Sequence, residues 1–175
     1  YDIEPGTTTD YVMDLRSADL HFVGYDFIYF LAFDVGGSRY LKTYQHTPEF
    51  IHNNLALMTN IFGELKTTKI PFMFTSSQMA NMSYSPYGLL KHTSELLTKA
   101  LGGLTVKFWN VYGIENDLEK AHVITDFILK AKSGKLDMMT DGTESRQFLY
   151  AEDCCECMEI LSHKYNDIDR DQELH

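Results

Sequence analysis

Residues 70–77, IPFMFTSS, carry the strongest signal for the fold. The apolar part is typical of a buried strand, and the hydroxyl residues Thr75, Ser76 and Ser77 indicate where that strand ends. Ser85-Pro86 then has the signature of a helix start, with serine as the N-cap and proline at the first helical position. We expect the helix to run to about Ala100, so this region predicts a strand followed directly by a helix.

The same alternation continues on both sides of this region. Further strands are predicted over residues 11–15, 26–32 and 104–109, and further helices over residues 47–66, 121–131 and 153–163. Thr47 and Asp153 are the expected N-caps of two of these helices. Strands that alternate with helices favour a parallel sheet, because each crossover returns the chain to the same end of the sheet. We therefore predict an α/β fold with a parallel sheet and helices on both faces.

Composition limits the classes of protein that the chain can belong to. It has 175 residues, the size of one domain, and a net charge of −10. The last 25 residues hold eight acidic and two basic side chains, so six of the ten charges lie there. This balance argues against a nucleic-acid-binding surface, which needs a basic stripe. The longest wholly apolar run, Phe27–Phe33, is too short to span a membrane. We expect one domain over residues 1–165 and an acidic, polar tail over residues 166–175 that is solvated or frayed.

Three cysteines, Cys154, Cys155 and Cys157, lie close together in the sequence. An odd number of cysteines in one cluster does not make a disulfide framework, so a reducing, cytoplasmic location is expected. A zinc site needs four ligands, whereas a Cys-Cys-x-Cys run on a helix spreads its side chains around the helix axis. We therefore expect no metal site and interpret the three as small residues of a helix core.

Tyr87 and Lys91 are the candidate catalytic pair. Their i, i+4 spacing puts both side chains on one face of the helix, one turn apart. A nearby ammonium favours the phenolate and is expected to lower the pKa of the tyrosine, and the Ser77 hydroxyl can share a substrate hydroxyl with it. These groups suit removal of a proton from an alcohol while a hydride leaves its carbon. Spacing alone favours the simpler interpretation, an exposed pair on the helix surface.

Ser76-Ser77 followed by Ser85-Pro86-Tyr87-Gly88-x-x-Lys91 resembles the core of the extended short-chain dehydrogenase/reductase family, which includes UDP-galactose 4-epimerase. The family consists of NAD(P)-dependent enzymes that act on nucleotide sugars. The resemblance covers roughly residues 11–160 and rests on an ordered set of motifs, none of which is specific alone. It implies a Rossmann-like domain, a nucleotide-sugar substrate, and a homodimer packed through the helices at residues 47–66 and 86–100.

The other matching segments are Asp14-Leu15, Phe30-Leu31-Ala32, Asp34 to Ser38, Asn54 with Asn60, Trp109 to Gly113, and Asp141 to Phe148 with Asp153. The resemblance implies catalytic roles for Ser77, Tyr87 and Lys91. It implies contacts with NAD or NADP from Asp14, Leu15, Leu31, Ala32, Phe33, Asn54, Ser76, Tyr87, Lys91 and Phe108. It implies contacts with the sugar nucleotide from Gly36, Gly37, Ser38, Asn110, His122 and Arg146.

Three departures from the family pattern restrict these expectations. The sequence holds no G-x-G-x-x-G or G-x-x-G-x-x-G turn, which would cradle the cofactor pyrophosphate. Ser77 and Tyr87 are only ten residues apart, where extended members usually carry a longer loop. Gln78-Met79 stands where nucleotide-sugar 4,6-dehydratases carry Asp-Glu, and neither residue supplies the acid or base for water elimination. Because the first residue, Tyr1, is not methionine, we also expect a partial chain whose Rossmann-like sheet is incomplete at both ends.

His122 has two interpretations. Its segment resembles part of GDP-fucose synthase, whose histidine works with a cysteine as a 3,5-epimerase acid/base pair, but the cysteine position corresponds to Gln78. The favoured alternative is a histidine at a helix N-terminus that contacts loop or ligand backbone.

These observations lead us to expect an NAD(P)-dependent nucleotide-sugar epimerase that acts by transient oxidation of a sugar hydroxyl. Tyr87 is the expected base, Lys91 is expected to tune it and bind the nicotinamide ribose, and Ser77 is expected to orient the sugar hydroxyl. Two alternatives stay open: a 4,6-dehydratase, reductase or 3,5-epimerase of the same family, and a catalytically silent nucleotide-sugar-binding module.

Overall fold

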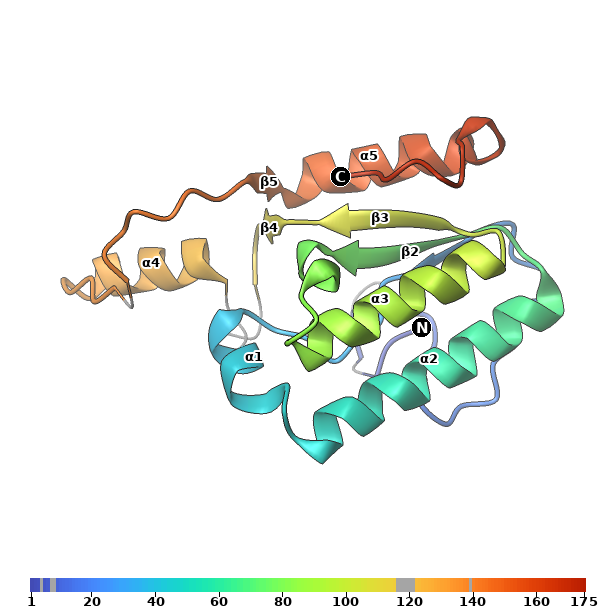
Figure 1. The fold of residues 1–175 in the computed structure, drawn as a ribbon, viewed down its shortest axis with the longest axis horizontal. Helices are drawn as coiled ribbons and strands as arrows, with labels where there is room; N and C mark the ends of the chain where they lie inside the picture. Colours follow the sequence, from blue (N-terminus) through green and yellow to red (C-terminus); the bar gives the residue numbers. More distant parts are fainter. Residues whose placement is uncertain (4, 7–8, 116–121, 139) are drawn as a thin grey trace.

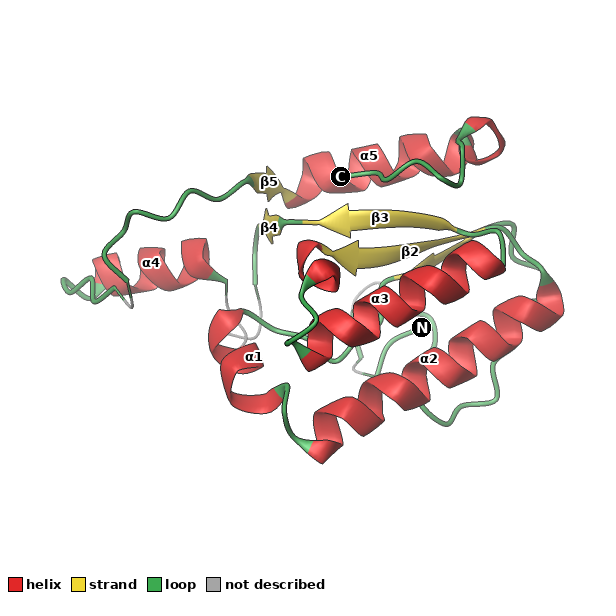
Figure 2. Ribbon diagram, in the orientation of Figure 1, coloured by secondary structure: helices red, strands yellow, loops and turns green. Residues whose placement is uncertain are grey.

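The structure, a computed structural model, describes residues 1–3, 5–6, 9–115, 122–138 and 140–175 (Figure 1). At its centre is a three-stranded parallel sheet in the order β1-β2-β3, shown in yellow in Figure 2. The strands are β1 (Ile28–Phe30), β2 (Phe72–Ser77) and β3 (Leu104–Phe108). The residue pairs Phe30–Phe74 and Ser77–Phe108 fix the register on the two sides of the central strand. The parallel α/β sheet predicted from the sequence is confirmed.

Two crossover helices cover one face of this sheet (Figure 1). α2 (Pro48–Thr68) joins β1 to β2, and α3 (Pro86–Ala100) joins β2 to β3. Phe30, Phe72 and Phe74 form one buried cluster with apolar side chains of both helices. Because side chains alternate along a strand, Phe72 and Phe74 point to the same face. This cluster is the larger part of the core and holds the two helices on the sheet.

The opposite face of the sheet is partly covered by α5 (Ala151–His163). Met73, which lies between the two phenylalanines of β2, packs there with Cys154 and Met158 of α5. Helices therefore lie on both faces of the sheet, as predicted.

Only one of the three cysteines belongs to this core. Cys154 is buried, whereas Cys155 and Cys157 are exposed, and all three are free thiols. The interpretation of all three as core residues is wrong for two of them, because neighbouring positions on a helix face different directions. Within the described part of the chain, no group of three or more His, Cys, Asp and Glu side chains is placed to hold a metal ion.

The remaining elements are short. They are α1 (Ser38–Tyr44), α4 (Val123–Lys132), two 3₁₀ turns, η1 (Gln78–Asn81) and η2 (Tyr165–Asp167), and a second parallel sheet of β4 (Asn110–Tyr112) and β5 (Phe148–Tyr150). α1 and η1 were not expected from the sequence, because segments of this length are too short to show a clear period. Among the helices that the structure describes, none has the length and apolar character needed to cross a membrane.

Two elements differ from the sequence-based expectation. Residues 11–15 form no strand, and their described pairing is one isolated bridge between Val12 and Asp2. A strand needs a continuous partner, which that bridge does not provide. The last helix begins at Ala151, directly after β5, so Tyr150 is its N-cap and Asp153 lies in its first turn.

Two residues of the acidic tail pack against the sheet. The backbone N–H of Lys107 in β3 donates to the carbonyl of Leu174 at 2.8 Å. The Lys107 ammonium donates to Glu173 Oε1 at 3.0 Å. Glu173 and Leu174 are therefore held at β3 rather than frayed, although most residues of the tail are exposed, as expected for a solvated segment.

Gly88 allows α3 to approach η1 more closely than any other residue would. A Cβ atom at this position would lie 2.1 Å from the carbonyl oxygen of Met79 and 3.0 Å from that of Met82. Gly63 in α2 serves as the control position, since a Cβ atom there would meet no atom within 4 Å. Both glycines are inside helices, so they differ mainly in the space around them.

We expect Gly88→Ala to lower the free energy of unfolding by about 1–3 kcal/mol, because the added methyl group collides with backbone atoms. Gly63→Ala is expected to raise it by about 0.5–1 kcal/mol, because alanine is the better helix former. Urea unfolding of the two variants measures both effects. A Gly88→Ala variant as stable as Gly63→Ala would contradict the close approach of η1 and α3.

Candidate active site

Serine side chains build the turn that brings the start of α3 back to the end of β2. Ser77 Oγ accepts a hydrogen bond from the N–H of Met79 at 3.2 Å and caps η1. Ser85 Oγ accepts from the N–H of Gly88 at 3.1 Å, as predicted for the N-cap of α3, and donates to Gln45 Oε1 at 2.7 Å. With its first turn fixed in this way, α3 begins next to the carboxyl end of the central strand.

Tyr87 lies in this first turn and is only 6% exposed. Its phenol is hydrogen-bonded to the Ser77 side chain. Burial raises the pKa of Tyr87 to about 12, and the hydrogen bond with Ser77 opposes that rise only in part. Tyr87 and Ser77 are therefore in direct contact, with the phenol protonated at neutral pH.

Lys91 lies one turn further along α3 and is 4% exposed. Its ammonium donates a hydrogen bond to the carbonyl of Thr75 at 2.7 Å. Aromatic rings surround the same nitrogen, with centroids at 3.9 Å for Phe33, 4.7 Å for Phe74 and 5.9 Å for Tyr87. One carbonyl and three ring faces thus form the environment of the ammonium.

Burial controls the charge of both catalytic candidates. It lowers the pKa of Lys91 to about 7, against the opposing effect of the Glu95 carboxylate. The sequence-based expectation that Lys91 lowers the pKa of Tyr87 is wrong for this structure, because desolvation of the phenol is the larger effect. The simpler interpretation of an exposed surface pair is also wrong. A buried phenol beside an amine that changes charge near neutral pH is suited to proton transfer.

A second polar cluster is centred on Glu95, one helical turn after Lys91, and was not recognised in the sequence. Ser76 Oγ donates to Glu95 Oε1 at 2.5 Å, and the Lys107 ammonium is 3.7 Å from the same oxygen. His92 Nδ1 lies 3.4 Å from the other Glu95 oxygen. Glu95 is four residues after Lys91, and that spacing was the available signal. The Ser76 hydroxyl, expected at the cofactor, is instead bound by Glu95.

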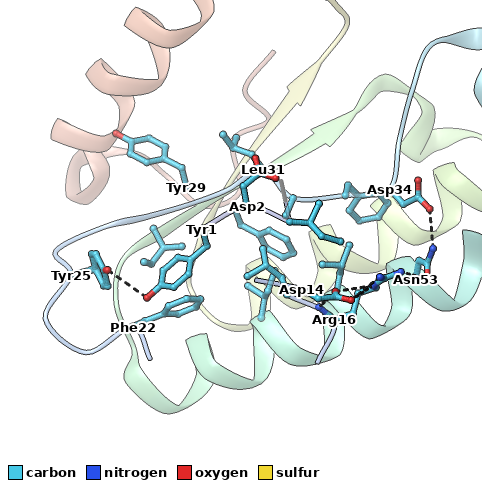
Figure 3. Close-up of a pocket in the computed structure, with 18 of the residues that line it drawn as sticks. Tyr1, Asp2, Asp14, Arg16, Phe22, Tyr25, Tyr29, Leu31, Asp34 and Asn53 are labelled. Atoms are coloured by element: carbon cyan, nitrogen blue, oxygen red, sulfur yellow. Dashed lines mark hydrogen bonds and ion pairs between the residues drawn. The ribbon is translucent and has the colours of Figure 1, made fainter. Parts of the chain in front are cut away.

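A cavity of about 680 Å³ lies beside β1, between the N-terminal segment and the middle of α2 (Figure 3). Its volume is in the range of small-molecule sites. Half of the ten residues that the resemblance assigns to the cofactor line it. They are Asp14, Leu15, Leu31, Ala32 and Phe33.

One end of the cavity is polar. Asp14 and Arg16 form a bidentate ion pair, with Arg16 Nη2 at 2.7 Å from Asp14 Oδ2 and Arg16 Nε at 2.8 Å from Asp14 Oδ1. Arg16 also donates to Asn53 of α2 at 2.7 Å, and Asn53 donates to Asp34 at 3.2 Å (Figure 3). The hydrogen bonds from Arg16 lower the pKa of Asp14. The opposite end holds Tyr1, Phe22 and Tyr25.

Two residues expected at the cofactor lie elsewhere. Asn54 is fully buried, and its amide accepts from the N–H of Asp34 at 2.8 Å and donates to the carbonyls of Asp34 and Phe50. Phe108 pairs with Ser77 in the sheet and packs on the α5 side. Asn54 therefore holds the chain that follows β1, while Phe108 belongs to the core.

The residues expected at the sugar nucleotide are spread over several elements. Gly36, Gly37 and Ser38 form the turn into α1, and Gly37 is its N-cap. Asn110 of β4 donates its amide to the carbonyl of Gln147 at 2.9 Å, and the neighbouring Arg146 is exposed. These residues lie near α1 or near the second sheet, and none of them is among the described residues that line the cavity beside β1.

His122 is the N-cap residue of α4 and is bound to a loop carboxylate. Its Nδ1 lies 2.5 Å from Glu115 Oε1, and its backbone N–H donates to the same carboxylate at 3.0 Å. Arg39 of α1 pairs with Asp126 of α4 at 2.9 Å, which ties the two helices together. The contact of His122 with Glu115 agrees with the favoured interpretation of a histidine at a helix N-terminus that contacts a loop.

A parallel sheet with Ser77, Tyr87 and Lys91 gathered at the carboxyl end of its central strand defines an α/β protein of the extended short-chain dehydrogenase/reductase class. Residues 12–174 match the NAD dependent epimerase/dehydratase family, and the chain belongs to that family.

Curated relatives and solved structures agree with this assignment. The chain is 39% identical over 111 residues to a trifunctional UDP-glucose 4,6-dehydratase/UDP-4-keto-6-deoxy-D-glucose 3,5-epimerase/UDP-4-keto-L-rhamnose-reductase of Arabidopsis thaliana, covering 59% of this chain and 16% of the relative. A second enzyme of that description and organism is 38% identical over 87 residues, which is 46% of this chain and 13% of the relative. The chain thus spans less than a fifth of the curated relatives that it matches.

Two solved structures share the fold. The NAD dependent NDP-hexosamine 5,6-dehydratase TunA, involved in tunicamycin biosynthesis, aligns with a TM-score of 0.70 at 17% identity, over 86% of this chain and 55% of that chain. Pen from Bacillus thuringiensis aligns with a TM-score of 0.61 at 21% identity, over 78% of this chain and 42% of that chain. The chain therefore corresponds to about half of each of these structures.

The buried lysine makes a prediction about stability and pH. The pKa of Lys91 is about 7 in the folded state, and that of an unfolded lysine is about 10.4. Between these values the unfolded chain binds more protons, so this group makes the free energy of unfolding rise with pH by up to about 1.4 kcal/mol per pH unit.

We expect Lys91→Met to remove this rise between about pH 7 and pH 10, while Lys66→Met, at an exposed position of α2, keeps it. Urea unfolding at several pH values within that range measures the slope. Equal slopes for wild type and Lys91→Met would show that Lys91 is charged in the folded state throughout the range.

Proposed function

We propose that this chain forms the catalytic part of an NAD(P)-dependent nucleotide-sugar epimerase that acts by transient oxidation of a sugar hydroxyl. The observation that carries the proposal is the buried cluster of Ser77, Tyr87 and Lys91, next to a cavity of about 680 Å³. Membership of the NAD dependent epimerase/dehydratase family gives the class of chemistry. The chain's own residues give the roles described below.

The cavity residues fit the ring systems of a dinucleotide. Its walls are largely apolar and aromatic, and Asp14 provides a carboxylate at the end where the resemblance places adenine. The residues of α2 that line it, Asn53, Leu57 and Ile61, come from the middle of the helix. Among the described lining residues Arg16 is the one cation, and its guanidinium is held by Asp14 and Asn53.

Proton transfer is the task of the three catalytic candidates. A bound nicotinamide cofactor would supply the hydride acceptor and donor that transient oxidation of the sugar carbon requires. Tyr87 can take the proton of the sugar hydroxyl only as the phenolate, so its own proton must first pass to solvent, and Ser77, which is hydrogen-bonded to the phenol, orients the sugar hydroxyl. The group that opposes the rise of the Tyr87 pKa is Ser77, through its hydrogen bond with the phenol.

Epimerisation is favoured over dehydration by the residues after Ser77. Gln78 and Met79 begin η1, and Met79 packs against the core. Neither can protonate a leaving hydroxide or remove a second proton from carbon. Glu95, the carboxylate bound to Ser76, is engaged by that hydroxyl and by Lys107. Gln78, Met79 and Glu95 therefore add no free acid or base to Tyr87 and Lys91, and transient oxidation and reduction need none.

A dehydratase or reductase is the second candidate. The trifunctional plant enzymes combine 4,6-dehydratase, 3,5-epimerase and reductase activities in their descriptions. This observation supports the same cofactor and substrate class with a different outcome. A catalytically silent nucleotide-sugar-binding module is the third candidate.

We also propose a homodimer and a cytoplasmic location. Leu55 of α2 and Leu89 and Leu96 of α3 are exposed on the two helices that the resemblance assigns to a dimer interface. Sedimentation of the purified chain tests this association, and a strictly monomeric chain would contradict it. The free thiols of all three cysteines support a reducing compartment, which localisation of a tagged protein tests.

We expect Tyr87→Phe in the full-length protein to lower turnover by about 10²–10⁴-fold, because it removes the hydroxyl that exchanges the proton. Binding of the sugar nucleotide is expected to change little, since the ring and its packing remain. Steady-state kinetics and calorimetric titration with the substrate measure the two effects. Tyr84→Phe, an exposed tyrosine outside the cluster, is the matched control and should retain activity. Near-normal turnover of Tyr87→Phe would remove this residue from the mechanism.

The product of the full-length enzyme distinguishes the candidate reactions. Incubation with UDP-, GDP- and dTDP-sugars should give a stereoisomer with unchanged mass, because neither Gln78 nor Met79 supplies the acid or base of water elimination. Mass spectrometry and nuclear magnetic resonance of the product measure this. A product lighter by one water would establish a dehydratase, and a product heavier by two hydrogens with consumption of NADPH would establish a reductase. No conversion of any sugar would favour the binding module.

A further inference from the structure

The catalytic cluster lies next to the cavity beside β1 but does not line it. Phe33 lines the cavity, whereas Ser77, Tyr87 and Lys91 are not among the described residues that line it. The exposed fractions of Tyr87 and Lys91, 6% and 4%, agree with this separation. A ligand in the cavity would therefore meet Phe33 before it met either catalytic candidate.

The Phe33 ring contacts both residues that it separates from the cavity. Its centroid lies 3.9 Å from the Lys91 nitrogen, nearer than any other ring in the cluster. It is 5.9 Å from the Tyr87 ring in an edge-to-face arrangement and 6.4 Å from the Phe74 ring. The face of Phe33 thus covers the ammonium, whose hydrogen bond goes to the Thr75 carbonyl.

The backbone directly after Phe33 is held firmly. The N–H and carbonyl of Asp34 are both bound by the amide of Asn54, at 2.8 and 3.2 Å. The Asp34 carboxylate also accepts hydrogen bonds from Tyr40 at 2.6 Å and from Asn53 at 3.2 Å. Because these four bonds fix residue 34, the ring can leave Lys91 by rotation of its own side chain without movement of the loop.

We propose that the Phe33 side chain controls access to the catalytic pair: it covers Lys91 and Tyr87 when the cavity is empty, and its rotation admits a ligand from the cavity. The identity of that ligand, the nicotinamide riboside part of a dinucleotide, rests on the proposed function. The ring is a positioning and access residue and takes no part in proton transfer. While the Phe33 ring covers Lys91, the ammonium stays hydrogen-bonded to the Thr75 carbonyl. The ligand takes the place of the ring when it binds.

Acetylation of lysines by N-hydroxysuccinimidyl acetate, followed by mass spectrometry of the peptides, tests the cover directly. In the wild-type chain Lys91 should react much more slowly than exposed Lys66. In the wild type, water and reagent reach Lys91 only when the site opens locally. Phe33→Ala removes the covering ring and should speed the reaction of Lys91 by about tenfold or more. Leu31→Ala, which alters the cavity wall without removing a contact of Lys91, should leave the rate at the wild-type value.

The labelling rate of Lys107 distinguishes local opening at Lys91 from a general loss of stability. It is as buried as Lys91 but is bound by Glu173 rather than covered by Phe33. The proposal requires that Lys91 becomes reactive in Phe33→Ala while Lys107 stays protected. Equal acceleration of both lysines, or an unchanged rate for Lys91, would overturn it. Phe33→Leu, which keeps most of the volume, should give a smaller acceleration of Lys91 and is the variant to use if Phe33→Ala does not fold.

Addition of NAD at millimolar concentration separates this proposal from the proposed function. If both hold, NAD slows the labelling of Lys91 more in Phe33→Ala than in wild type, because the cover is already removed. If Phe33→Ala exposes Lys91 but NAD protects neither protein, access control by Phe33 stands and the cofactor assignment fails. Equal protection of Lys91 in both proteins would show that Phe33 is no barrier to the ligand, and the proposal would fail.

Discussion

The hydrogen bond from the Lys91 ammonium to the Thr75 carbonyl joins α3 to the end of the central strand. A buried cation needs such an acceptor, because removal from water without one costs several kcal/mol. The rings of Phe33 and Phe74 complete its environment, so apolar packing of the core and the position of the charge are set together. Tyr87 is on the same helix one turn earlier, and its contact with Ser77 follows from this attachment. A charge placed at this cost to stability is typical of a functional site.

The two serines at the end of β2 have separate tasks. Ser76 turns to the interior, where it binds Glu95 close to Lys107, and so connects β2, β3 and α3. Ser77 caps η1 and meets the phenol. Gly88 permits η1 to lie against α3, which closes the short connection between Ser77 and Tyr87. The ten-residue spacing that departs from the family pattern is thus accommodated by a compact turn.

Much of the fold followed from local sequence signals, and much of the site's electrostatics did not. The strand before Thr75 and the helix start at Ser85-Pro86 were predicted correctly, because buried strands and N-caps depend on a few neighbouring residues. The spacing of Tyr87 and Lys91 likewise showed that they share a helix face. It could not show how deeply they are buried, and burial reversed the expected direction of the Tyr87 pKa. The bridge from Leu174 to β3 and the cover over Lys91 depend on distant segments, which carry no local signal.

The position of β1 at the margin of the main sheet has a consequence for the behaviour of the chain at high concentration. Of the described strands, β1 pairs with β2 alone, so within the described residues no strand lies on its other side. Tyr29 and Leu31 are 40% and 55% exposed at this margin, and Tyr29 points away from the α2 side in Figure 3. An open, apolar strand of this kind is a template for strand addition from another molecule. Aggregation through β1 would then compete with the proposed association through α2 and α3, and a charged residue at position 29 or 31 would protect against it.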